Sequence, residues 1–312
     1  MATRNEKQNV IIAYVYLFLV VFLWGVCPLF SKYLLEYFSP SMFSAIGCTI
    51  SAISLLIICI PNLKQLNAKY FLTALPLGFF IGLASLLQKI GLQYTTPAKY
   101  SFLENLSCIS VPILLFLFTK KKPNLLTIIA SLLCLLATFL LSGITLSGDG
   151  ATFKIGEILC ALSGILYGVN IAGTGVFAKD LYTPLYIMIQ MWVQAISLFI
   201  ISFVLNSITV NGAPIQALKY TLDFKIIMSL ALLFLFSNTL CWILRTSAMK
   251  QISASVVAVI TPVSAIITTT FSIIVGYDAI SPSLIISAII FVGASILSSV
   301  GDNKDRKKLL EN

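Results

Sequence analysis

The sequence predicts an all-α integral membrane protein, with ten transmembrane helices arranged in two inverted five-helix repeats. Three observations lead to this prediction. Of the 312 residues, 59% are hydrophobic and only 10% are charged, with a mean hydropathy of +1.01, whereas about a quarter of the residues of soluble domains are charged. The apolar residues form blocks of about 20, each long enough to cross a hydrocarbon core of about 30 Å. Short motifs of the first half recur in the second.

The apolar blocks are separated by polar or helix-breaking residues, and each block predicts one helix. In chain order, the predicted helices span residues 11–30, 41–60, 71–91, 97–118, 125–143, 156–178, 184–206, 225–243, 253–275 and 282–300. The first block is longer than the apolar core of a signal peptide and is followed by Ser31-Lys32 rather than by a small-residue cleavage site, so we expect a retained helix. The short connections predict that consecutive helices are antiparallel neighbours.

The basic residues favour one orientation in the membrane. If the N-terminus is cytoplasmic, 14 of the 20 basic residues fall on the cytoplasmic side and six outside. Because cytoplasmic loops carry an excess of Lys and Arg, we expect both termini in the cytoplasm, with the basic tail Lys304 to Lys308 beside anionic headgroups. The 14 residues are Arg4, Lys7, Lys64, Lys69, Lys120, Lys121, Lys122, Lys179, Arg245, Lys250, Lys304, Arg306, Lys307 and Lys308.

Internal repetition divides the chain into two predicted units, residues 1–148 and residues 149–312. At a spacing of 143, Trp24-Gly25 recurs as Tyr167-Gly168, and residues 52–58 resemble residues 195–201. At a spacing of 150, Thr96 matches Thr246, Gln88 matches Asn238 and Pro112 matches Pro262. Five helices per unit is an odd number, so the second unit enters the membrane from the opposite side. Inverted repeats are a recurring architecture of secondary transporters.

Enzyme chemistry has little support in this sequence. The chain has no histidine and its seven cysteines form no CxxC pair, so a serine–histidine catalytic pair or a mixed metal site is not expected. Only Glu104 lies well inside a predicted helix, whereas an aspartyl dyad needs two carboxylates. A Walker A sequence is absent, so transport driven by ATP bound to this chain is not expected. We predict no enzyme activity, no metal, no cofactor and no nucleic-acid partner.

Glu104 is the most informative single residue. A charged acidic group near the centre of a membrane helix costs roughly 2.5–3.5 kcal/mol on insertion scales, so such groups usually face a polar interior and mark ion or substrate paths. Ser101, Ser107 and Cys108 share its helix face at spacings of three and four. Glu104 is the candidate coupling residue, binding a proton or a cationic group of the substrate. The alternative is a structural glutamate paired with a lysine, for which Lys89 and Lys99 are close in the sequence.

Other polar or amphipathic residues within the predicted helices are candidates for the wall of a central cavity. Each one alone fits interhelical hydrogen bonding as well as substrate contact. Prolines inside helices free a backbone carbonyl and are candidate hinges, with plain kinks as the alternative. The candidate cavity residues are Trp24, Gln88, Glu104, Asn105, Tyr167, Asn170, Gln190, Asn238 and Trp242, and the candidate hinges are Pro28, Pro112 and Pro262.

Three segments together resemble a known family. They are Trp24-Gly25, the stretch from Leu87 to Lys99 that continues to Val111-Pro112, and the second-half segment from Ala254 to Pro262. They are similar to the EamA family of the drug/metabolite transporter superfamily. The resemblance implies a ten-helix secondary transporter of the bacterial inner membrane, with a central cavity between the repeats, exporting amino acids, metabolites or drugs. Glu104 departs from the small or hydroxyl residue expected at its position.

The sequence therefore predicts a multi-pass transporter of the bacterial plasma membrane that works by alternating access, with a small solute, membrane lipid and protons as its partners. Two alternatives keep the same fold: a membrane scaffold that does not transport, and a passive channel. Polar residues converging on a closed cavity favour the transporter. A cavity filled by apolar side chains favours the scaffold, and a continuous pore the channel.

Overall fold

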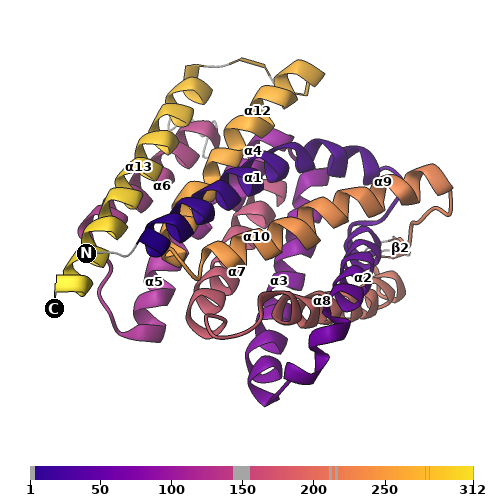
Figure 1. Cartoon of the computed structure of the whole chain (residues 1–312). Helices are drawn as coiled ribbons and strands as arrows, with labels where there is room; N and C mark the ends of the chain where they lie inside the picture. The colour runs from indigo at the N-terminus through magenta and orange to yellow at the C-terminus, as the bar shows by residue number, and fades with distance from the viewer. Residues whose placement is uncertain are drawn as a thin grey trace.

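The structure, a computed structural model, describes residues 4–142, 155–210, 213–214, 217–277, 279–280 and 282–311. Figure 1 shows a bundle of helices with one very small pair of strands. The strands β1 (Thr209–Val210) and β2 (Ala213–Pro214) are antiparallel, with Thr209 opposite Pro214. The predicted all-α class is confirmed.

The helices follow the predicted blocks closely. The first half holds α1 (Arg4–Leu34), α2 (Pro40–Cys59), the 3₁₀ helix η1 (Ile60–Gln65), α3 (Ala68–Gln93), α4 (Pro97–Glu104), α5 (Ser107–Thr119) and α6 (Leu125–Ser142). The second half holds α7 (Ile155–Phe177), α8 (Thr183–Ser207), α9 (Phe224–Phe234), the π-helical turn η2 (Leu235–Leu240), α10 (Cys241–Ala248), α11 (Ala254–Ile260), the 3₁₀ turn η3 (Thr261–Val263), α12 (Ser264–Val275) and α13 (Pro282–Glu311).

Eight helical stretches in the described part of the chain are long and apolar enough to cross a membrane. Two shorter apolar helices, Leu125–Ala137 and Ile285–Gly301, correspond to the other two predicted blocks. Large apolar side chains cover the outside of the bundle, for example Phe18, Leu72 and Ile289, which are 71%, 75% and 68% exposed. Such a surface is suited to lipid, because a helix satisfies its own backbone groups and needs no water.

The predicted helix at 97–118 is interrupted. It begins at Thr96, whose hydroxyl accepts a hydrogen bond from the backbone N–H of Lys99. It breaks after Glu104, where the side-chain amide of Asn105 donates to the carbonyl oxygen of Ser101. That carbonyl is the normal acceptor for the backbone N–H of Asn105, which instead bonds to Phe102. Asn105 therefore explains the break between α4 and α5.

The second half is interrupted at two places that were predicted to be continuous. The predicted helix at 225–243 passes through the π turn η2 and continues to Ala248. The predicted helix at 253–275 is divided by η3, where Pro262 has no N–H to donate to the helix. By contrast, α5 continues through Pro112.

Helices of the first half pack against helices of the second half in a repeated pattern. α2 packs on α8, and α6 packs on α13; the second pair runs side by side on the left of Figure 1. α3 packs against α7, and in the same way α10 packs against α1. α5 packs against α7, as α12 packs against α1. The contacts named here thus have counterparts when the halves are exchanged.

The helix boundaries support one predicted repeat spacing and correct the other. α2 begins at Pro40 and α8 at Thr183, 143 residues apart as predicted. α5 and α12, however, begin at Ser107 and Ser264, 157 rather than 150 residues apart. Part of the extra length lies in α8, which has 25 residues against 20 in α2. By these boundaries Pro262 lies two residues before α12, as Asn105 lies two residues before α5, so they do not support the predicted match of Pro262 with Pro112. The predicted boundary at 148/149 lies outside the described residues.

Candidate functional site

A polar cavity lies inside the bundle, and both halves of the chain supply its wall. The space that the centre of a water molecule can reach is about 90 Å³. One water needs roughly 10–15 Å³ by this measure, so several waters or a small solute fit. Its polar and aromatic lining residues include Trp24, Ser31, Ser85, Gln88, Lys89, Tyr100, Ser101, Glu104, Asn105, Ser107, Tyr167, Gln194, Ser237, Asn238, Trp242, Arg245, Thr261 and Ser264.

Arg245, in the last turn of α10, is the most deeply buried charged residue of this wall, at 2% exposed. Its guanidinium carbon lies 3.8 Å from the centroid of the Trp242 ring and 5.4 Å from that of Trp24. Its Nη2 donates a hydrogen bond to Oδ1 of Asn170 at 3.1 Å. Its Nε has no hydrogen-bond partner among the described residues. Cation–π contact stabilises the charge of the guanidinium. Among the described residues, no carboxylate oxygen lies within 4 Å of it to neutralise that charge.

Trp24 ties α1 to the π turn of the second half. Its indole Nε1 donates to the backbone oxygen of Ser237, within η2, at 2.8 Å. Its ring lies 5.9 Å from that of Trp242, at an interplanar angle of 59°. A π turn shifts the hydrogen-bond register of a helix and is often found at functional sites. Here the turn contains Ser237, whose backbone oxygen accepts the hydrogen bond from the indole of Trp24 in the first half.

A second cation, Lys89 of α3, lies in the cavity wall near Glu104. Its Nζ donates to the hydroxyl groups of Tyr100 at 3.2 Å and of Ser31 at 3.4 Å. It also lies 5.6 Å from the centroids of the Phe43 and Tyr100 rings. Within the described residues, no ion pair shorter than 4 Å joins Glu104 to Lys89 or to Arg245. If all three are ionised, the cavity wall carries one net positive charge.

Neutral polar groups complete the wall. Tyr167 of α7 donates its hydroxyl hydrogen to Oε1 of Gln88 on α3 at 3.0 Å. Ser101 is 4% exposed, and its hydroxyl has no partner within the described chain. Unpaired buried polar atoms are uncommon, because each costs about 1–3 kcal/mol. The wall therefore offers hydrogen-bonding capacity that the described protein groups do not use.

Glycines bring α7 close to the α4–α5 break. A Cβ added at Gly164 would collide with the backbone oxygen of Glu104, and one at Gly168 would collide with the hydroxyl of Ser110. These contacts agree with the close approach that small-residue pairs spaced by four allow between membrane helices. Gly164 and Gly168 thus set the position of Tyr167, which lies between them on α7.

Residues 11–143, a segment that ends just after α6, match the EamA-like transporter family. The match covers 133 of the 312 residues. The family resemblance deduced from the sequence is thereby confirmed. The second half is related to known proteins through the whole-chain comparisons.

Two further similarities extend over nearly the whole chain. An uncharacterized transporter of Archaeoglobus fulgidus is 26% identical over 286 residues, which cover 90% of this chain and 84% of that protein. A solved crystal structure of another protein has a TM-score of 0.71 with 14% sequence identity, and the alignment covers 94% of this chain and 98% of that one. At this identity, the second similarity concerns the fold alone.

Seven of the nine predicted cavity residues line the cavity: Trp24, Gln88, Glu104, Asn105, Tyr167, Asn238 and Trp242. Asn170 and Gln190 do not. Asn170 is fully buried behind Arg245, and its amide donates to Oε1 of Gln190 at 3.3 Å and to the backbone oxygen of Leu77 at 3.4 Å. These two residues support Arg245 from behind. Of the predicted hinges, only Pro28 lies in the wall.

Sequence reasoning did not include either cation among the cavity residues. Arg245 was assigned to a cytoplasmic segment because the predicted helix ended at residue 243, but α10 continues to Ala248 and places Arg245 in the wall. Lys89 was considered as a possible partner of Glu104, and it lines the same cavity. One available signal was spacing, because Trp242 and Arg245 lie three residues apart and so share one helix face.

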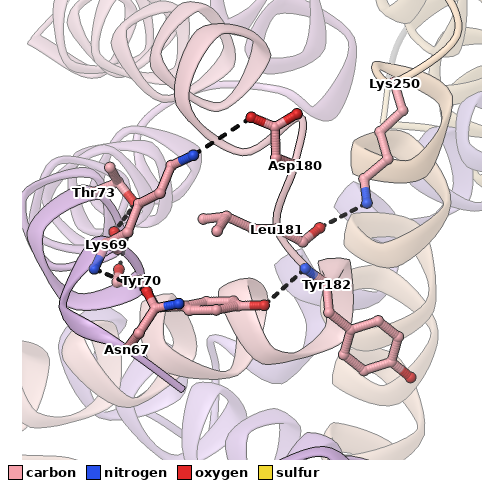
Figure 2. A network of polar contacts seen from close by, with 8 residues as sticks. All are labelled: Asn67, Lys69, Tyr70, Thr73, Asp180, Leu181, Tyr182 and Lys250. Atoms are coloured by element: carbon pink, nitrogen blue, oxygen red, sulfur yellow. Dashed lines mark hydrogen bonds and ion pairs between the residues drawn. The ribbon is translucent and has the colours of Figure 1, made fainter. Parts of the chain in front are cut away.

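Polar contacts join three segments that are far apart in the sequence, as Figure 2 shows. Lys69 at the start of α3 pairs with Asp180 in the α7–α8 turn at 3.4 Å. The backbone N–H of Tyr182 donates to the hydroxyl of Tyr70 at 2.9 Å. Lys250, beyond the end of α10, donates to the backbone oxygen of Leu181 at 2.7 Å. We call these six residues the Asp180 network.

The donor groups suit an organic solute rather than a metal. No group of three or more His, Cys, Asp or Glu side chains comes together within the described residues. The single carboxylate in the cavity lining is that of Glu104, beside two cations. Two cations, one carboxylate, two indoles and several hydroxyl and amide groups can instead orient a small polar molecule.

Proposed function

We propose that this multi-pass membrane protein is a secondary transporter that exports small metabolites, amino acids or drugs across the bacterial plasma membrane by alternating access. The observation that carries the proposal is the charged cavity inside a bundle whose outer surface is apolar. Charged side chains are costly in membrane helices and usually mark ion or substrate paths. The EamA-like match and the transporter relative support the same function.

We further propose ten membrane-crossing segments in two inverted five-helix repeats. The support is the paired packing, in which α3 on α7 and α5 on α7 have the counterparts α10 on α1 and α12 on α1. The shorter apolar helices of α6 and α13 pack on each other and would complete the ten. Two similar units of opposite orientation can exchange conformations and expose a site between them to each side in turn.

Both termini are cytoplasmic in this proposal. The count of basic residues changes from 14 against six to 13 against five, because Arg245 and Lys89 lie in the cavity and belong to neither side. The excess still favours the predicted orientation. The Asp180 network then lies at the cytoplasmic end, where it holds α3, α8 and α10 together.

Counterflow in proteoliposomes tests the function. Purified protein is first screened by thermal shift against amino acids, nucleosides, organic cations and organic acids. Compounds that stabilise it are then assayed as radiolabelled tracers in vesicles preloaded with the same unlabelled compound. An alternating-access carrier gives transient accumulation of tracer above the outside concentration. A passive channel gives equilibration without overshoot, and a scaffold gives no flux; either result would reject the proposal.

A matched pair of variants tests whether the transported solute passes through the cavity. Ser101→Trp adds bulk inside the cavity, whereas Ile57→Trp adds an indole on the outer face of α2, where Ile57 is 64% exposed. We expect Ser101→Trp to abolish counterflow and Ile57→Trp to retain it, at equal amounts of inserted protein. Equal activity of both variants would place the transport path elsewhere.

A further inference from the structure

The charges of the cavity wall do not balance. Glu104 is the one carboxylate that the described lining offers to two cations, and it interacts more strongly with Lys89 than with Arg245. No described carboxylate lies within 4 Å of the Arg245 guanidinium, whose neighbours are two indole rings and the amide of Asn170. Arg245 is therefore the cation that lacks a carboxylate. A buried, unpaired charge is unfavourable in a low-dielectric interior, so an anion supplied by a ligand would stabilise this site.

The surroundings of Arg245 favour a planar anion. One face of the guanidinium lies against Trp242, and Asn170 holds Nη2 from behind. A guanidinium has five N–H donors in a flat fork, and Asn170 Oδ1 is the one hydrogen-bond acceptor that the described residues provide for it. The remaining in-plane donors, including the unpartnered Nε, match the two oxygens of a carboxylate.

Aromatic surface lies next to these donors. Trp24 lines the cavity 5.4 Å from the guanidinium carbon, and its indole N–H is already bonded to the backbone of Ser237. Its ring therefore offers apolar contact rather than a hydrogen bond. The site combines one fixed cationic fork with an indole surface, a pairing suited to an acid that has an apolar body.

We propose that Arg245 is the carboxylate-binding residue of the cavity, and that the transported solute is a small organic acid. This inference rests on the proposed transport function and specifies its substrate class. It differs from the expectation drawn from Glu104 alone, which favoured a proton or a cationic group. Glu104 and Lys89 offset each other in charge, and Arg245 makes the site selective for anions.

Matched sets of acid, amide and amine test the proposal by isothermal titration of the purified, full-length protein in detergent. Acetate, phenylacetate and indole-3-acetate are compared with acetamide, phenylacetamide and indole-3-acetamide, and with ethylamine, phenethylamine and tryptamine. We expect at least one acid to bind, and its amide and amine to bind about 10- to 100-fold more weakly, the usual effect of losing a hydrogen bond to a charged group. No binding by any acid, or equal binding by the amine, would overturn the proposal.

Two variants locate the binding at Arg245. Arg245→Gln should weaken acid binding about 10- to 100-fold. Asn170→Asp keeps the arginine but gives it an internal carboxylate, so it should weaken acid binding by competition, and it serves where Arg245→Gln does not fold. Lys69→Gln, which removes a cation in the Asp180 network, should bind like the wild type. Unchanged acid affinity in Asn170→Asp or in folded Arg245→Gln contradicts the assignment.

The counterflow assay separates this inference from the transport function. Counterflow of an amine or a neutral solute without counterflow of any acid would leave the transporter standing and reject the acid specificity. Acid binding that is lost in Arg245→Gln, together with no counterflow of any compound, would keep the Arg245 site and reject transport.

Discussion

At the residue scale, the site combines Glu104 with two cations that are fixed in different ways. Lys89 is held by two hydroxyl groups, whereas Arg245 is held by an amide and an indole face. None of these partners carries a full negative charge. The carboxylate of Glu104 therefore contributes to the potential of the whole cavity, and its ionisation would lower the net charge of the cavity wall by one unit.

Replacing Glu104 with glutamine should separate its charge from its shape. Gln is nearly isosteric, so we expect Glu104→Gln to insert and fold normally. If proton binding at Glu104 couples to transport, the wild-type rate should vary with pH by up to about tenfold per unit, as for a single titrating group, and the variant should be flat. Counterflow in proteoliposomes between pH 6 and pH 8 measures this. Identical pH profiles would make Glu104 a structural residue.

At the element scale, the cavity depends on close helix contacts and on interrupted helices. α7 approaches α4 at Gly164, next to the break that Asn105 causes. In the second half, the π turn η2 lies where Trp24 bonds to Ser237. Irregular backbone at membrane depth is tolerated where other protein groups satisfy it, and the side chains of Asn105 and Trp24 do so here.

Gly164→Ala should destabilise the protein. The added methyl group would meet the backbone oxygens of Glu104 and Leu103, which cannot move as a flexible side chain can. Overpacking of this kind costs typically about 1–3 kcal/mol. Gly293→Ala is the matched control, because an added Cβ there meets no atom within 4 Å; it should be neutral or stabilising by up to about 1 kcal/mol. Thermal unfolding in detergent tests both, and equal behaviour of the variants would argue against close α4–α7 packing.

The Asp180 network should derive its stability from the partly buried hydrogen bond between Tyr182 and Tyr70 rather than from the ion pair. The side chains of Lys69 and Asp180 are 53% and 85% exposed, so Asp180→Asn should change the free energy of unfolding by about 0–1 kcal/mol. Tyr70 is 3% exposed, and Tyr70→Phe should cost about 1–2 kcal/mol because the N–H of Tyr182 loses its acceptor. Unfolding measurements that rank the two variants in the opposite order would contradict this.

At the scale of the whole molecule, apolar side chains face outward and polar ones line an interior that the two halves share. The paired contacts between helices exchange when the halves are exchanged. For such a molecule, orientation in the membrane is set by the charges of the connections rather than by the core. The connections are thus the place to test the topology.

Impermeant thiol labelling of intact cells should report opposite sides for two connections. Lys121 lies between α5 and α6, and Lys219 lies between α8 and α9; both are exposed. In a background without the natural cysteines, we expect a cysteine at position 219 to label from outside and one at position 121 to label only after the membrane is permeabilised. Labelling of both from outside, or of 121 alone, would reject cytoplasmic termini.

The sequence by itself determined the class of the protein, the position of its apolar helices and seven of the residues that line the cavity. Composition and block length are enough for this, because a lipid-exposed helix must be apolar along its whole length. Only the tertiary structure decided that Arg245 and Lys89 join Glu104, that Asn170 and Gln190 lie behind the wall, and that Pro262 is placed before α12 as Asn105 is placed before α5. Hydropathy along one chain does not distinguish a basic residue at a membrane boundary from one turned inward. For Arg245, the inward position depends on contacts with the indoles of Trp24 and Trp242 and with the amide of Asn170.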